Sequence, residues 1–151
     1  MEIKKILFAT DFSEGSINAL PYAVDIAMRH GAKIYAVHVI FDMTKAAGWY
    51  VPHASAEEVY ADLEKSARKQ LEKTFSEDMR KFKDFENVLL RGTPYEEITK
   101  FAEANKIDLI VLATHGRTGI DRLIFGSTAE QVVRYAPCPV LSVRLPQHKS
   151  A

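Results

Sequence analysis

Five short apolar segments alternate with four longer amphipathic segments along this chain of 151 residues. The apolar segments have the length of β-strands and are rich in Val, Ile and Leu: 3–9, 32–40, 85–91, 107–113 and 138–144. The segments between them repeat apolar residues every three or four positions, which is the helical period: 13–30, 56–82, 94–105 and 128–136. This alternation is typical of an α/β fold, in which helices connect parallel strands.

Local signals support the predicted helices. Gly31 follows the first helix as a stop signal, and Pro94 suits the first position of the third helix. Three helix starts carry a capping box, a Ser or Thr followed three residues later by Glu: Ser55–Glu58, Thr93–Glu96 and Ser127–Glu130. In the first helix we expect the buried face to hold Ile17, Leu20, Val24 and Ala27. The apolar positions of the second helix are Val59, Leu63, Ala67, Leu71, Phe75, Met79 and Phe82.

The order of these elements predicts one domain over residues 1–151. The segments 3–9 and 107–113 are almost wholly apolar, as expected for strands that are covered on both faces of a parallel sheet. Right-handed connections then give a doubly wound five-stranded parallel sheet, for which we expect the strand order 3-2-1-4-5. The connection 41–55 is long and irregular, and Trp49 within it is a candidate flap over a ligand.

Charge and composition exclude several classes of protein. Lys plus Arg and Asp plus Glu both number 20, so no overall field attracts nucleic acid or an anionic membrane. The apolar run near the N-terminus is too short to insert into a bilayer. The only cysteine, Cys138, excludes an internal disulfide and reads as a small hydrophobic residue. We therefore expect a cytoplasmic protein that neither binds nucleic acid nor inserts into a membrane.

The predicted topology nominates one place for a ligand. In open α/β sheets, ligands bind beyond the carboxyl ends of the strands where the strand order reverses. With the order 3-2-1-4-5, this point lies between strands 1 and 4. Two sequence stretches meet there: "ATDFS" after strand 1 and "ATHGRTGIDRLIFGST" after strand 4.

The second stretch has the chemistry of an anion site. Gly116 lets backbone N–H groups approach a ligand closely, and Arg117 supplies positive charge. Gly126 and Ser127 open a helix, whose free N–H groups favour phosphate, and the hydroxyls of Ser127 and Thr128 suit phosphate or a bound Mg²⁺. The spacing alone is equally consistent with a plain glycine-rich turn that binds no anion. Neither a P-loop nor a G-x-G-x-x-G motif is present.

Three further polar residues lie near this point. Asp11 suits a ribose hydroxyl or an adenine amino group, or else it caps the first helix, where Ser13 is the better N-cap candidate. His115 suits a phosphate contact, but it lacks the neighbouring acid of a catalytic set. His38 lies within the second strand and reads as a hydrogen-bonded core residue.

Together these residues resemble the universal stress protein family over essentially the whole chain. The family's domain opens with a strand leading into "TDFS" and carries "HV" on its second strand, which are here Thr10–Ser13 and His38–Val39. Its nucleotide-binding members share the motif G-x2-G-x9-G-(S/T), followed by a helix and a "PVLVV" strand. The matching positions here are Ala113, Gly116, Gly126 and Ser127, followed by "PVLSV" at 139–143.

The resemblance implies a Rossmann-like fold, similar to the adenine nucleotide alpha hydrolases, and binding of ATP with Mg²⁺ or Mn²⁺. By this resemblance, the adenosine end of the nucleotide would contact Thr10, Asp11 and the backbone around Val39. The ribose and α-phosphate would contact Ala113 and Gly116. The β- and γ-phosphates would contact Gly126, Ser127 and Thr128, with His115 and Arg117 as further contacts in the same loop.

Ala113 departs from this motif, which has glycine at its first position. The methyl group is harmless if Ala113 keeps a negative φ at the end of its strand. A positive φ there would cost about 1 kcal/mol or more.

The resemblance also implies a homodimer through the last strand, Pro139–Arg144, and physical reasoning agrees because an apolar edge strand must be paired or covered. The leading hypothesis is an ATP-binding regulatory protein that acts through an unidentified protein partner. One alternative is a slow ATPase or phosphotransfer enzyme, for which no complete catalytic set is evident in the sequence. The other is a nucleotide-free dimeric adaptor.

Overall fold

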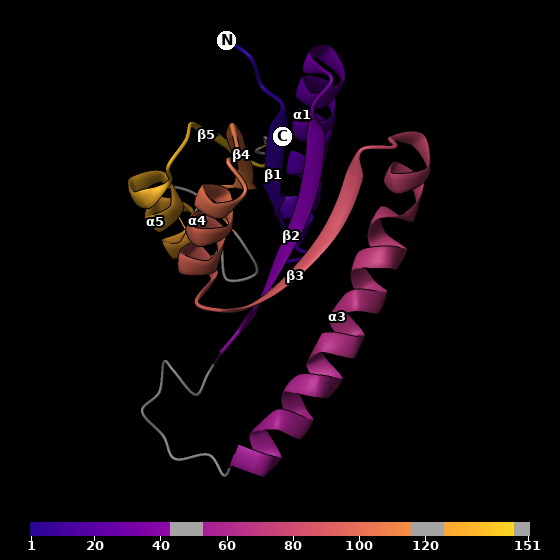
Figure 1. Cartoon of the computed structure of the whole chain (residues 1–151), viewed down its shortest axis with the longest axis vertical. Coiled ribbons are helices and arrows are strands. Elements are labelled where there is room, and N and C mark those ends of the chain that lie inside the picture. The colour runs from indigo at the N-terminus through magenta and orange to yellow at the C-terminus, as the bar shows by residue number, and fades with distance from the viewer. Residues whose placement is uncertain (43–52, 116–125, 147–151) are drawn as a thin grey trace, which may run out of the picture.

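The structure, a computed structural model, describes residues 1–42, 53–115 and 126–146. Strands and helices alternate along these residues (Figure 1). The elements are β1 (Lys5–Ala9), α1 (Glu14–His30), β2 (Lys33–Phe41), α3 (His53–Lys81), β3 (Phe85–Gly92), α4 (Pro94–Ala104), β4 (Leu109–Ala113), α5 (Ser127–Tyr135) and β5 (Val140–Val143). Each predicted strand and helix is confirmed, and the largest difference in a boundary is at α3, which begins at His53 rather than at residue 56.

The five strands form one sheet in the predicted order, β3-β2-β1-β4-β5. All of the pairings are parallel: Ile6 of β1 lies opposite Ile34 of β2 on one side and opposite Leu109 of β4 on the other. At the far end of β4, Ala113 pairs with Val143 of β5. The strand order reverses between β1 and β4, so their carboxyl ends lie side by side at the switch point.

Helices cover both faces of the sheet, which explains the continuous apolar character of its central strands. Ile6 and Phe8 of β1 pack in the core under α1 and α3, whereas Leu7 packs in the core under α4 and α5. Figure 1 shows the same division, with α4 and α5 together on one side of the sheet and α1 and α3 on the other. The predicted doubly wound architecture is therefore confirmed.

The buried stripes of α1 and α3 agree with the predicted positions only in part: Leu20, Ala27, Ala67, Leu71 and Phe75 are buried as predicted, and four other positions are exposed. In α1, Ser16 and Ala19 are buried and Ile17 is 41% exposed, because the helix approaches the sheet through its small residues. In α3, Tyr60 is buried, while its neighbour Val59 is 57% exposed. The other predicted apolar positions that lie exposed on α3 are Leu63 and Met79. The predictions that placed Ile17, Val59, Leu63 and Met79 on the buried faces were wrong, although the helices themselves were predicted correctly.

The predicted capping boxes are not formed as expected. At α4, Thr93 is the N-cap but its side chain makes no capping hydrogen bond, and Pro94 already removes one of the N–H groups that a cap serves. At α5, Gly126 is the N-cap and Ser127 is the first helical residue, because the carbonyl of Gly126 accepts from the N–H of Glu130 at 2.9 Å. Since α3 begins at His53, Ser55 lies inside that helix and is not its cap.

Within the described ranges, no helix has both the length and the apolar character needed to cross a membrane. Residues 43–52 lie outside those ranges, so the predicted flap at Trp49 stays a prediction.

Candidate functional site

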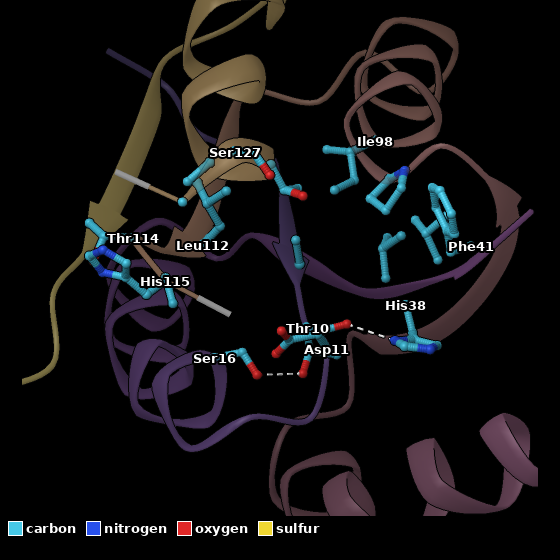
Figure 2. Close-up of a pocket in the computed structure, with 18 residues that line it drawn as sticks. Thr10, Asp11, Ser16, His38, Phe41, Ile98, Leu112, Thr114, His115 and Ser127 are labelled. Atoms are coloured by element: carbon cyan, nitrogen blue, oxygen red, sulfur yellow. Dashed lines mark hydrogen bonds between the residues drawn. The ribbon is translucent and has the colours of Figure 1, made fainter. Parts of the chain in front are cut away.

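A cavity of about 400 Å³ opens at the carboxyl ends of β1, β2 and β4, beside the first turns of α4 and α5 (Figure 2). The site predicted from the sequence falls on this cavity. The predicted residues that line it are Thr10, Asp11, Val39, Ala113, His115, Gly126, Ser127 and Thr128. The other two, Gly116 and Arg117, lie outside the described residues.

The turn after β1 is held by hydrogen bonds from both its backbone and its side chains. The N–H of Thr10 donates to the carbonyl of Val37 at 2.9 Å, which extends the pairing of β1 with β2 by one residue. The hydroxyl of Thr10 accepts from the N–H of Phe12 at 3.0 Å and lies 2.9 Å from the hydroxyl of Ser16 on α1. Buried Thr10 therefore ties the end of the strand to the start of the helix.

Asp11 lies within this turn, where its side chain makes a local bond, and its predicted contact with a ligand stays a prediction. One of its carboxylate oxygens, Oδ1, accepts from the N–H of Ser13 at 3.0 Å, so the side chain has a local structural role. Asp11 also lines the cavity, at its lower edge in Figure 2. Ser13 is the N-cap of α1, as predicted, and its hydroxyl accepts from the N–H of Ser16 at 3.2 Å.

Phe12 has a φ of +65°, in the left-handed region that a bulky residue rarely adopts. Such a conformation costs of order 1–3 kcal/mol and persists only where the surroundings enforce it. The ring of Phe12 lies against the imidazole of His38, with 4.5 Å between ring centroids. In turn, Nδ1 of His38 is 2.9 Å from the carbonyl oxygen of Thr10. His38 is thus hydrogen-bonded, as predicted, but it also lines the cavity, which was not predicted.

The opposite wall of the cavity joins the end of β4 to the start of α5. The N–H of Thr114 donates to the carbonyl of Val143, and the carbonyl of Thr114 accepts from the N–H of Gly126 at 2.7 Å. A Cβ on Gly126 would lie 2.7 Å from that carbonyl oxygen. A side chain at this position would therefore push α5 away from β4, so the glycine permits a close approach of two backbones.

The first turn of α5 faces the cavity through Gly126, Ser127 and Thr128. An α-helix leaves the N–H groups of its first turn without partners inside the helix, and its N-terminus carries partial positive charge. This end of the cavity therefore has the chemistry of an anion site, with two hydroxyls beside it. Figure 2 shows Ser127 on the far side of the cavity from Asp11.

Ala113 ends β4 in regular pairing with Val143 and is not among the non-glycine residues with positive φ. Its methyl group lies beside Gly15 of α1, 3.6 Å from the point that a Cβ on Gly15 would occupy. The condition under which alanine is harmless at the first position of the motif is therefore met.

His115 extends the wall at the end of β4. Its Nδ1 lies 3.2 Å from the hydroxyl of buried Thr114, in a hydrogen bond. Its Nε2 is buried and has no hydrogen-bond partner among the residues that the structure describes. No carboxylate orients this ring within those residues, so the arrangement lacks the orienting acid of a catalytic set.

The apolar part of the cavity was not predicted. Its lining residues are Ala9, Val37, Phe41, Pro94, Ile98, Leu112 and Ala129. Most of them stand at strand ends or helix starts, so the predicted topology held the signal. The buried hydroxyls of Ser16 and Thr114 were missed as well, because neither belongs to a motif.

Metal and thiol chemistry are not evident at the cavity. In residues 1–42, 53–115 and 126–146, no group of three His, Cys, Asp or Glu side chains is placed to hold a metal ion. Cys138 packs against the core between the sheet and α4 and α5. Burial, and secondarily the charge of Asp108, raises the pKa of its thiol, which agrees with the predicted role as a small hydrophobic residue.

Comparison with known proteins identifies the family. The model of the Universal stress protein family matches residues 2–144. A universal stress protein of Methanocaldococcus jannaschii, MJ0531, is 38% identical over 148 residues, which cover 95% of this chain and 84% of that protein. The solved structure of MJ0577 from the same organism is 27% identical and superposes with a TM-score of 0.85 over 98% of this chain and all of that one.

A universal stress protein from Archaeoglobus fulgidus was solved in complex with dAMP. It is 24% identical to this chain, with a TM-score of 0.64 over 94% of this chain and 98% of that one, so this likeness shows the fold alone. The match to the family model spans nearly the whole length, and it agrees with the fold and with the motifs at the ends of β1 and β4. The chain belongs to the universal stress protein family.

Proposed function

We propose that this protein binds ATP in the cavity between β1 and β4 and acts as a regulatory protein through a partner that responds to the nucleotide. One observation carries the proposal: a turn rich in polar side chains and the start of a helix face each other across a single cavity at the switch point of the sheet. A polar sugar and a phosphate chain need these two different surfaces at the two ends of one site.

The adenosine end would lie against the turn after β1. The Asp11 carboxylate accepts hydrogen bonds from a ribose hydroxyl or an adenine amino group, and Val39 offers its backbone to the edge of the base. Apolar side chains such as Ile98 and Leu112 line the same cavity and suit the faces of an adenine ring. The volume of about 400 Å³ falls in the range of ordinary small-molecule sites.

The phosphate end would lie at the start of α5. The N–H groups of its first turn would donate to phosphate oxygens, and the hydroxyls of Ser127 and Thr128 would donate as well. Gly116 and Arg117 belong to the same proposal by the family motif. His115 would lie close to the phosphate groups.

A Mg²⁺ or Mn²⁺ ion would bind with the nucleotide rather than to the protein alone. The described residues hold no group of acidic or imidazole ligands for a metal. Phosphate oxygens and hydroxyls are the ligands that Mg²⁺ commonly uses in nucleotide sites. We therefore expect metal binding to depend on the presence of ATP.

Two further observations favour a nucleotide over an empty adaptor. Ala113 was the residue that favoured the adaptor, and it has no positive φ in the structure. Another protein with this fold holds dAMP, which makes adenine nucleotides the first compounds to test.

Isothermal titration calorimetry with ATP and Mg²⁺ tests the proposal directly. We expect saturable binding of ATP and weaker binding of AMP, which lacks the β- and γ-phosphates that would contact the start of α5. Absence of binding at millimolar ATP would contradict the proposal. Retention of a nucleotide through purification, detected by mass spectrometry after denaturation, gives an independent readout.

We also propose that two copies pair through β5, within the segment Pro139–Arg144. β5 is an edge of the sheet and only four residues long, and its Leu141 is half-buried in the monomer. Isologous pairing would cover both edges at once. Light scattering after size-exclusion chromatography should give twice the mass of the chain, and a monomer at high concentration would contradict the pairing.

A further inference from the structure

We infer that His38 is a positioning residue for Asp11: it fixes the turn on both sides of Asp11 and thereby aims the Asp11 carboxylate at the adenosine end of the nucleotide. The inference rests on the proposed function and adds to it a residue whose imidazole is not assigned to the ligand. Its basis is that one side chain of β2 contacts both Thr10 and Phe12, the two neighbours of Asp11 in the chain.

The first contact is with the residue before Asp11. The carbonyl oxygen of Thr10 is 2.9 Å from Nδ1 of His38, and a carbonyl oxygen only accepts, so Nδ1 carries the hydrogen and donates it. The N–H of Thr10 donates to the carbonyl of Val37. Both backbone groups of Thr10 are therefore bound to consecutive residues of β2. The peptide group that joins Thr10 to Asp11 has its carbonyl held by the imidazole (Figure 2).

The second contact is with the residue after Asp11. The imidazole of His38 lies 4.5 Å from the ring of Phe12, at an interplanar angle of 37°. Phe12 has a φ of +65°, a conformation that its surroundings must enforce. The imidazole supports that conformation from one side, and the bond from the N–H of Phe12 to the hydroxyl of Thr10 supports it from the other.

These contacts contribute to where Asp11 points. The left-handed residue reverses the chain directly after Asp11, which brings the N–H of Ser13 within 3.0 Å of Oδ1 of Asp11. The direction of the carboxylate thus depends on the φ of Phe12 and on the peptide group before Asp11, and His38 contacts both. Loss of His38 leaves the hydrogen bond between the hydroxyls of Thr10 and Ser16, so we expect a loosened turn rather than an unfolded protein.

Substitutions separate the two contacts of the imidazole. His38→Phe retains a ring against Phe12 and removes the donor to Thr10, whereas His38→Asn retains a donor and removes the ring. We expect His38→Phe to weaken binding of ATP with Mg²⁺ by about 3- to 10-fold, the effect of one hydrogen bond. His38→Asn should recover part of that loss. His30→Phe, at the exposed end of α1, is the matched control and should bind as the wild type does.

A double-mutant cycle decides whether His38 acts through Asp11. With Asp11→Ala as background, adding His38→Phe should change the affinity for ATP less than twofold. Loss of the full 3- to 10-fold in that background, or no loss in the single variant, would overturn the inference. Absence of ATP binding by the wild type would instead reject the proposed function. Amide hydrogen exchange without ligand gives a separate readout: it should quicken at Phe12 and Ser13 in His38→Phe but not at Ala23 in α1, and unchanged rates at Phe12 and Ser13 would equally overturn the inference.

Discussion

The turn after β1 and the start of α5 line the same cavity but are built in different ways. In the turn, hydroxyl and carboxylate groups of Thr10, Asp11 and Ser13 bind nearby N–H groups, so side chains hold the backbone. At the start of α5, Gly126 brings the backbone of the helix to the carbonyl of Thr114, and no side chain caps the helix. Under the proposed function, the turn would recognise a nucleotide through the identity of its side chains. The helix start would do so through free backbone groups and the absence of side-chain volume.

This difference predicts how each region responds to substitution. Replacing a polar side chain in the turn by one of similar shape should cost only a moderate loss of ligand affinity, because several hydrogen bonds together hold the turn. A side chain on a glycine at a close approach of two backbones must displace one of them, because the contact is with a backbone carbonyl rather than with a flexible side chain. Four changes, taken in order of expected effect, test the distinction.

The largest effect is expected from Gly126→Val combined with Ser127→Ala. A Cβ on residue 126 would lie 2.7 Å from the carbonyl oxygen of Thr114, so α5 must move away from β4 and the phosphate end is lost. We expect ATP affinity to fall about 100-fold or more and the free energy of unfolding to fall by about 1–3 kcal/mol. Calorimetry and a thermal melt measure the two quantities.

Gly31→Ala is the matched glycine control for that experiment. Gly31 has a φ of +65°, but no atom lies within 4 Å of the point that a Cβ would occupy, and the residue stands at the other end of α1. The control should lose about 1 kcal/mol of stability with unchanged affinity. Comparable loss of ATP binding in Gly31→Ala would mean that binding follows global stability rather than the geometry at Gly126.

A smaller effect is expected from Asp11→Asn in the turn. The amide oxygen of Asn still accepts from the N–H of Ser13, so the turn is retained, but the negative charge toward the adenosine is lost. We expect about a 10-fold loss of affinity for ATP and a change in stability of under about 0.5 kcal/mol.

Asp108→Asn is the control for Asp11→Asn. The Asp108 carboxylate accepts from the N–H groups of Lys4 and Lys5 at the opposite end of the sheet, far from the cavity. The amide oxygen of Asn still accepts but without the negative charge that two N–H groups share here, so this variant should lose at most about 1 kcal/mol of stability and bind ATP normally. Equal affinities for Asp11→Asn and the wild type would remove Asp11 from the proposed site.

Much of the fold was predictable because it depends on periodic patterns and on topology. The apolar runs at 3–9 and 107–113 predict strands covered on both faces, and the structure places Leu7 and Phe8 in cores on opposite faces. Strand order then sets which loops meet, so the cavity between β1 and β4 follows from the alternation of elements. These features depend on many residues at once, and single errors do not change them.

The details that failed depend on single contacts. The face of α1 that packs on the sheet includes Ser16 and Ala19. These are small residues whose burial is not predicted by their hydropathy, so Ile17 was wrongly placed on the buried face. The left-handed Phe12 and the bond from His38 to Thr10 have no pattern in the sequence, because they arise only when β1 and β2 are side by side. The same holds for the glycine contact at Gly126, which a turn motif indicates without giving its partner.

A modest effect is expected from Gly15→Ala, which couples the two regions. Gly15 lies in the first turn of α1, and a Cβ there would lie 2.9 Å from the carbonyl oxygen of His115 after β4. Alanine favours a helix by about 1 kcal/mol over glycine, whereas displacing a backbone carbonyl costs typically 1–3 kcal/mol. The steric effect should win: we expect lower stability and about a 3-fold loss of ATP affinity. A rise in melting temperature with unchanged binding would show that β4 gives way freely at this point.

The smallest effect is expected from Ala113→Gly, which restores the glycine of the family's motif. Ala113 has no positive φ and pairs regularly with Val143, so the backbone gains nothing from glycine. Its methyl group packs beside Gly15, and removing it should lower the free energy of unfolding by about 0.5–1 kcal/mol. Affinity for ATP should stay within about twofold of the wild type, since the methyl lies toward α1. A 10-fold gain in affinity would instead show that the methyl obstructs the nucleotide. The size of the side chain at residue 113 would then limit binding, as we expect at residue 126.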